Sequence, residues 1–178
     1  KSHSHIKCIL RNSYDDCEFE TLVQRADGLQ GGLLFVIECE HKTRRHRFAC
    51  HIDGPLIAPS DPKAELRTTC PVTFYSISGA FEGGDGIVQI AVPSNKQWVN
   101  VAGTEGAVKN DKGEPRANVC IARGYLWLGR ANPGPAADLS RCHQWIKNDM
   151  PDGYSGGYTE KGSGMLAQSM SFTCDEME

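Results

Sequence analysis

The chain has 178 residues, 39% of them hydrophobic, and a formal net charge of −3. This length suits one ordinary domain, and the slightly acidic balance argues against a protein that attracts nucleic acid or an anionic membrane through an overall positive field. No apolar segment approaches the roughly 20 residues that a bilayer-spanning helix needs. The sequence has no zinc-protease, P-loop, dinucleotide-binding or EF-hand motif, so we expect no cofactor and no nucleic-acid partner.

The eight cysteines are the most informative feature of the sequence. None of them has the short spacing of a zinc knuckle. An even number in a chain of this size predicts four disulfides, and so a secreted protein whose signal peptide is removed upstream of residue 1. The alternative is a cytosolic protein with buried free thiols, and the sequence leaves the pairing open. The cysteines are Cys8, Cys17, Cys39, Cys50, Cys70, Cys120, Cys142 and Cys174.

The first predicted element is a helix that ends before Gly28. Ser13 or Asp15 can cap its beginning, and acidic side chains follow in its first turn. Apolar residues recur at the spacing of one helical face. These residues are Phe19, Leu22, Val23 and Ala26.

A hairpin follows, with strands at 33–39 and 48–52 and a polar tip at 42–47. A four-residue loop at 43–46 places Ile37 opposite Ile52 and Cys39 opposite Cys50, so that these two cysteines could bridge. The same register places His41 opposite Phe48. The remaining polar side chains then share the other face. They are Glu38, Glu40, Arg47 and His51.

The rest of the chain predicts further strands and one short helix. We expect strands at 70–80, 86–92, 97–102, 117–128 and 165–174, with loops at 53–67, 103–116, 129–137 and 151–164. Asp138 predicts the cap of a helix over 139–149, with Leu139, Cys142 and Ile146 on one side. The pattern indicates an antiparallel, β-sheet-dominated α+β fold stapled by disulfides.

We expect residues 1–178 to form one domain. The alternative is a helix-plus-sheet domain at 1–80 and a β-rich domain at 86–178, divided at Gly79–Gly86. The second half holds three cysteines, which is an odd number. At least one disulfide would therefore cross that boundary unless a cysteine stays free.

The segment Gly153-Tyr154-Ser155-Gly156-Gly157 matches the serine nucleophile motif G-x-S-x-G. In the hydrolases with this motif, the catalytic histidine follows the serine in the sequence. Here the last histidine, His143, precedes Ser155. A chymotrypsin-like order of His51, Asp85 and Ser155 fits better, with His51 taking the serine proton. The short chain after Gly157 speaks against that barrel, so Ser155 is a weak catalytic candidate, and a glycine-rich surface turn is the alternative.

The hairpin tip is the candidate binding site. It concentrates positive charge that could contact phosphate, an acidic partner or a lipid headgroup. Glu38 and His51, as predicted cross-strand neighbours, could act as a ribonuclease-like acid–base pair. The alternative is a tip whose charges only keep the hairpin soluble. The tip residues are Lys42, Arg44, Arg45, His46 and Arg47.

Two further sets of residues could bind ligands. If Lys1 is the mature N-terminus, His3 has the position that binds Cu(II) or Ni(II), with His5 as an additional ligand. A frayed end without a metal is the alternative. Tyr154 and Tyr158 lie in a glycine-rich loop, where their rings could stack on sugars.

In size, cysteine content and element order the chain resembles the small secreted cysteine-rich effectors, or avirulence proteins, of plant-pathogenic fungi. A helix beside Cys8 and Cys17, followed by strands with Cys39, Cys50 and Cys70, is similar to the opening of the dual-domain effectors of Fusarium and the helix-on-sheet avirulence proteins of Leptosphaeria. The resemblance assigns no functional residue. It implies a non-enzymatic, extracellular virulence protein that binds a host protein or cell-surface component. We expect the protein to be a monomer. A secreted hydrolase, ribonuclease-like or serine-protease-like, and a glycan-binding module are the alternatives.

Overall fold

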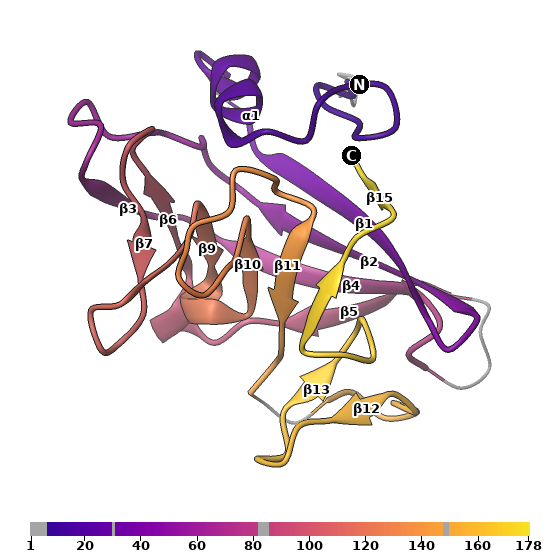
Figure 1. Ribbon diagram of the computed structural model, residues 1–178. Coiled ribbons are helices and arrows are strands. Elements are labelled where there is room, and N and C mark those ends of the chain that lie inside the picture. The colour runs from indigo at the N-terminus through magenta and orange to yellow at the C-terminus, as the bar shows by residue number, and fades with distance from the viewer. Residues whose placement is uncertain (1–6, 30, 82–85, 148–149) are drawn as a thin grey trace, which may run out of the picture.

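The computed structural model describes residues 7–29, 31–81, 86–147 and 150–178 (Figure 1). Two antiparallel sheets dominate it, and 41% of the described residues are in strands, whereas 8% are helical, including the short 3-10 turns. The first sheet contains, in spatial order, β15 (Glu176–Met177), β1 (Leu33–His41), β2 (Arg44–Ile52), β4 (Val72–Ser78) and β5 (Val88–Ala91). The β-dominated, antiparallel α+β prediction is thus confirmed.

The second sheet has six strands. In spatial order they are β14 (Ser171–Thr173), β11 (Arg141–Gln144), β10 (Leu126–Leu128), β9 (Val119–Ile121), β6 (Trp98–Ala102) and β3 (Glu65–Thr69). Two short ladders accompany it, β7 (Val108–Lys109) with β8 (Pro115–Ala117), and β12 (Gly157–Tyr158) with β13 (Gly164–Met165). Short 3-10 turns, η1 (Ser94–Lys96) and η2 (Ala122–Gly124), precede β6 and β10.

The inner faces of the two sheets share one hydrophobic core. Phe48 of β2 packs edge-on against Phe172 of β14, and Phe74 of β4 lies beside Tyr125, which follows η2. Strands from before Gly79 and after Gly86 occur in both sheets. The two halves of the chain therefore bury their apolar side chains against each other.

The β1–β2 hairpin turns at Lys42 and Thr43, both with positive φ, and His41 pairs with Arg44. The predicted four-residue loop and its register are therefore wrong, and Cys39 lies opposite His46 instead of Cys50. A two-residue turn with both residues at positive φ usually contains glycine or asparagine, and Lys-Thr gives no such signal. The register differs by an even number of residues, so the predicted division of side chains between the two faces still holds.

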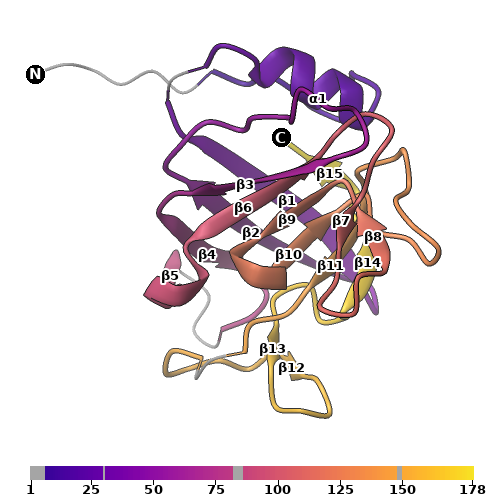
Figure 2. The ribbon, with the colours of Figure 1, turned by 90° about the vertical axis from the view of Figure 1, so that its left-hand side faces the viewer.

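Helix α1 (Phe19–Ala26) lies across one end of the molecule, opposite β12 and β13 (Figure 2). Its predicted apolar face is confirmed, because Phe19, Leu22 and Ala26 are buried. The predicted cap is wrong, since the helix begins after Glu18, whose side chain makes no capping bond. Asp15 instead accepts hydrogen bonds from the backbone N–H of Arg11 and from Arg25.

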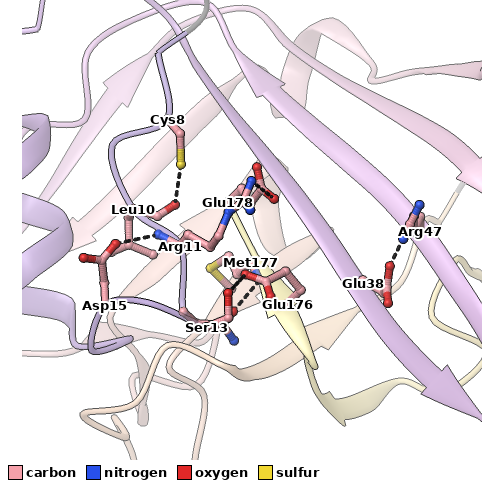
Figure 3. A network of polar contacts seen from close by, with 11 residues as sticks. Cys8, Leu10, Arg11, Ser13, Asp15, Glu38, Arg47, Glu176, Met177 and Glu178 are labelled. Atoms are coloured by element: carbon pink, nitrogen blue, oxygen red, sulfur yellow. Dashed lines mark hydrogen bonds and ion pairs between the residues drawn. The ribbon is translucent and has the colours of Figure 1, made fainter.

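The segment before α1 is held by the C-terminal strand (Figure 3). Arg11 forms an ion pair with Glu178 at 2.5 Å, and the Ser13 hydroxyl lies 3.1 Å from a carboxylate oxygen of Glu176. Asn12 exchanges hydrogen bonds with the backbone of Met177. Because β15 pairs with β1, these contacts attach the N-terminal segment to the first sheet.

Several other predicted elements need correction. Residues 139–149 contain strand β11 instead of a helix, because Asp138 accepts bonds from Ser140 in a local turn and the following residues join the sheet. The predicted loop 53–67 ends in β3, and the predicted strand 117–128 is two strands joined by η2. The predicted strand 165–174 is also interrupted, because β13 ends at Met165 and β14 begins only at Ser171, and the predicted loops 103–116 and 151–164 hold strands β7 and β12.

Replacing Phe48 by alanine tests the shared core. Phe48 is fully buried between the sheets, so we expect Phe48→Ala to lower the free energy of unfolding by about 3–5 kcal/mol. Urea denaturation measures the change. Ile87→Ala, at a residue that is 68% exposed, serves as the control and should stay within about 0.5 kcal/mol of the wild type. Equal effects of the two substitutions would contradict a core centred between the sheets.

Candidate functional site: the hairpin tip and the cysteine groups

The tip of the β1–β2 hairpin carries an exposed group of cations. All four cations at the tip are exposed: Lys42, Arg44, Arg45 and Arg47. Strands β1 and β2 have nine residues each, and the turn that joins them lies at the far end of the hairpin. We call these four residues the tip cations. Strand alternation places Arg45 and Arg47 on the outward face, whereas Lys42 lies in the turn. Arg44 is in phase with the buried residues of β2 and is exposed because it lies next to the turn.

Glu38 partly neutralises the tip cations. Glu38 is opposite Arg47 in the ladder, and its carboxylate forms an ion pair with Arg47 (Figure 3). The same carboxylate forms a second ion pair, at 3.2 Å, with Arg45. Within the described part of the chain, no carboxylate forms an ion pair with Lys42 or Arg44. One carboxylate thus orients two guanidinium groups and leaves the turn itself positively charged.

Two residues of the predicted site lie elsewhere. His46 points into the core and is 4% exposed, and burial lowers the pKa of its imidazole. His51 lies four positions along β2 from Arg47, the partner of Glu38, which is about 13 Å at 3.3 Å per residue. The structure therefore does not bring Glu38 and His51 together as the acid–base pair that the predicted register suggested.

Ser155 is exposed and its backbone N–H binds the carbonyl of Ala80, just beyond the end of β4. His51 pairs with Thr73 near the start of the same strand. Ser155 and His51 are therefore at opposite ends of β4, and Asp85 lies outside the described residues. This geometry does not assemble the chymotrypsin-like arrangement.

Tyr154 and Tyr158 have different roles in the glycine-rich loop. The Tyr154 hydroxyl donates toward the carbonyls of Gly157 and Met165 and accepts from the N–H of Met165, so it holds the β12–β13 ladder together. Its ring packs edge-on against Phe81 and Tyr158. Tyr158 is 54% exposed and alone remains open for stacking on a ligand.

Four cysteines from four segments lie in the region of β11. The Cys142 thiol donates a hydrogen bond of 3.4 Å to the carbonyl of Leu139, and Cys174, Cys17 and Cys39 lie close enough to raise the pKa of Cys142. The backbone N–H of Leu139 binds the carbonyl of Cys17, and the backbone N–H of Cys174 binds the carbonyl of Ser140. These bonds attach the segments of Cys17 and Cys174 to the residues just before β11. We call Cys17, Cys39, Cys142 and Cys174 the cysteine cluster.

The other cysteines are separate from this cluster. Cys50 of β2 interacts with Cys70, which follows β3, so these two form a second group. Cys120 is buried in β9, and Cys8 is exposed in the segment before α1. All eight cysteines are free thiols in this structure.

Burial suppresses ionisation of the cluster thiols. It raises the pKa of Cys17 and of Cys39 to about 12, and it raises the pKa of Cys142 well above the usual value. Thiolates are the reactive form, so these groups are poor nucleophiles near neutral pH. Their arrangement favours a structural role over a catalytic one.

A pair that sequence reasoning missed joins β11 to β14. His143 and Ser171 are directly opposite each other, and Nδ1 of His143 is 2.9 Å from the Ser171 hydroxyl. Burial and the charge of Arg130 lower the pKa of His143 to about 4. The neutral imidazole is therefore a weak base, and the bond links two strands. The misassigned helix over 139–149 concealed this pair.

No family model, curated protein or solved structure matches the chain. Among the described residues no helix combines the length and apolarity needed to cross a bilayer. No group of three or more histidine, cysteine or acidic side chains in the same residues could hold a metal ion. His3 and His5 lie outside the described residues, so the N-terminal copper or nickel site stays a prediction.

The low pKa of His143 predicts loss of stability in acid. In the unfolded chain His143 has the ordinary pKa of 6.5 and takes up a proton below that pH, whereas in the folded protein it stays neutral down to a pH of about 4. The free energy of unfolding should therefore fall as the pH is lowered from 6.5 to 4, by about 3 kcal/mol at 1.36 kcal/mol per pKa unit.

Urea unfolding at pH 7 and pH 4 checks this expectation. His143→Asn keeps a polar group beside Ser171 but cannot be protonated, so its loss of stability over the same interval should be smaller. His46 titrates in both proteins and cancels in the comparison. Equal losses in the wild type and the variant would refute the assignment.

Proposed function

We propose that the protein is a secreted, disulfide-stapled binding protein, similar to the effectors that its sequence resembles. It engages a host protein or cell-surface component through the hairpin tip and acts by binding instead of catalysis. The observation that carries this proposal is the exposed group of tip cations on a hairpin whose other face is buried. An acidic protein surface is the partner that this charge favours.

The tip suits recognition because its cations are held in place before binding. Ion pairing with Glu38 restricts the side chains of Arg45 and Arg47, which reduces the conformational entropy that they lose on binding. Lys42 and Arg44 extend on either side of Thr43 with their charge uncompensated by the described carboxylates. An ion-paired pair of arginines and two cations without an ion-paired carboxylate thus lie together at the end of the hairpin.

The grouping of cysteines supports the secreted part of the proposal. Cys142 lies within electrostatic reach of Cys174, and Cys50 lies within reach of Cys70. The four cysteines of the cluster can pair in three ways. Because Cys174 influences the ionisation of Cys142 more than Cys17 or Cys39 does, we expect Cys142–Cys174, which leaves Cys17 with Cys39. Such bridges would connect the first sheet, the second sheet and the segment before α1, and disulfides of this kind persist in oxidising compartments.

A disulfide map tests the compartment and the pairing. We expect protein isolated without reductant to be lighter than its reduced form by the mass of two hydrogens for each disulfide. The linked peptides should include Cys142–Cys174 and Cys50–Cys70. Intact mass before and after reduction, followed by peptide mapping, provides the measurement. Eight free thiols in such a preparation would contradict the secreted proposal.

Charge reversal at the tip tests the binding surface. We expect the double variant Lys42→Glu/Arg44→Glu to lose most of its affinity for an immobilised acidic polypeptide, poly-glutamate, because repulsion replaces attraction at the contact. Surface plasmon resonance at two salt concentrations measures the change. Wild-type binding should weaken at high salt, since exposed charges are screened.

The matched control is Lys63→Glu/Lys112→Glu, which has the same net charge but reverses two exposed lysines away from the tip. This control should keep most of the wild-type affinity. Vesicles of phosphatidylcholine and phosphatidylserine provide the second arm. If both variants lose affinity equally, or if only vesicles bind the wild type, the proposed acidic protein partner is wrong.

A further inference from the structure

Three basic side chains lie at the same end of the central strands of the six-stranded sheet, outside the hairpin tip. We call this place the sheet edge. Lys96 ends η1 just before β6, Arg123 lies in η2 between β9 and β10, and Lys147 follows β11. The strands β6, β9, β10 and β11 are antiparallel neighbours. The start of β6, the β9–β10 turn and the end of β11 therefore lie at the same end of these strands (Figure 1). The sheet therefore gathers three cations that are far apart in the sequence.

Lys96 is at the centre of this group. Its side chain is half-buried, and its ammonium group donates a hydrogen bond of 2.5 Å to the hydroxyl of Tyr125. The same nitrogen lies 4.3 Å from the centre of the Tyr125 ring. Burial lowers the pKa of Lys96, and the charges of Lys147 and Arg123 lower it further. Both neighbours therefore lie within electrostatic reach of the ammonium group.

These charges lack an internal counter-charge within residues 7–29, 31–81, 86–147 and 150–178. No carboxylate there forms an ion pair with Lys96, Arg123 or Lys147. Mutual repulsion and the partial burial of Lys96 both cost free energy. The tip cations differ, because two of them share Glu38. An anion bound from solution would offset the cost at the sheet edge.

The surroundings of Arg123 add a second indication. Ala122 and Arg123 both have φ of +52°, in the left-handed region that side chains with a Cβ rarely adopt, and Gly124 follows at +94°. Strained backbone of this kind concentrates at functional sites. The indole N–H of Trp145, whose backbone N–H binds the Tyr125 carbonyl, is buried without an acceptor among the described residues.

We propose that Lys96, Arg123 and Lys147 form a binding site for a tetrahedral oxyanion, phosphate or sulfate, which arrives free or as an ester on a larger ligand. A guanidinium group can bind two oxygens of such an anion through its paired donors, and lysines add point charges. Gln97, next to Lys96, binds the backbone of Val72, at the end of β4 remote from the hairpin tip. The oxyanion site is therefore separate from the surface invoked in the proposed function.

Calorimetric titration with inorganic phosphate, and separately with O-phosphoserine, tests the site in a low-salt buffer free of other oxyanions. We expect saturable binding to one site by the full chain. Arg123→Gln/Lys147→Gln should bind about tenfold more weakly or not at all. Both residues are exposed, so these substitutions remove charge without opening the core. Tighter binding of phosphoserine than of phosphate would identify an ester as the ligand class.

Lys63→Gln/Lys112→Gln is the matched control, because it removes the same charge from two exposed lysines that belong neither to the tip cations nor to the proposed oxyanion site. It should retain wild-type affinity for both probes. Phosphate should also raise the thermal unfolding midpoint of the wild type and this control, but not of Arg123→Gln/Lys147→Gln. Should the double variant fail to fold, Lys147→Gln alone replaces it. Absence of saturable binding to the wild type, or equal weakening in both variants, would overturn the proposal.

Discussion

The burial of one face of the β1–β2 hairpin is the constraint on which the candidate site depends. Phe35, Ile37, Phe48 and Ile52 point into the shared core, and successive side chains in a strand point to opposite faces. Fixing the apolar residues inside therefore fixes the charged residues outside. Glu38 refines the positions of the arginines, but the core decides that they lie on the surface.

The same constraint explains what the sequence could predict about the hairpin. Alternation predicted both strands and both faces, because burial acts on every second residue. The register depended on the turn, and Lys42-Thr43 lacks the glycine or asparagine that normally indicates positive φ. The error of an even number of residues left the faces intact but separated Glu38 from His51 and Cys39 from Cys50. Pairwise site predictions therefore failed where face predictions succeeded.

Elsewhere the errors arose where local signals and tertiary packing disagree. Leu139, Cys142 and Ile146 have a helix-like spacing, but His143 and Gln144 between them are also buried, as in a strand covered on both faces. Likewise, the prolines of 53–67 concealed β3, whose residues pair with β6. Neither the His143–Ser171 pair nor the Lys96–Arg123–Lys147 group has a sequence motif, because each is assembled by neighbouring strands that only the sheet order brings together.

The distribution of charge determines how such a protein can recognise a ligand. The chain has 22 acidic and 19 basic side chains, and its long-range field is therefore weakly negative. Solution ions screen charges beyond about 8–10 Å at physiological ionic strength. An anionic ligand at the hairpin tip or at the sheet edge consequently responds to the few cations within that distance, and not to the net charge. Recognition by this chain then depends on close contact and local geometry more than on long-range attraction, which favours specificity over rapid, indiscriminate association.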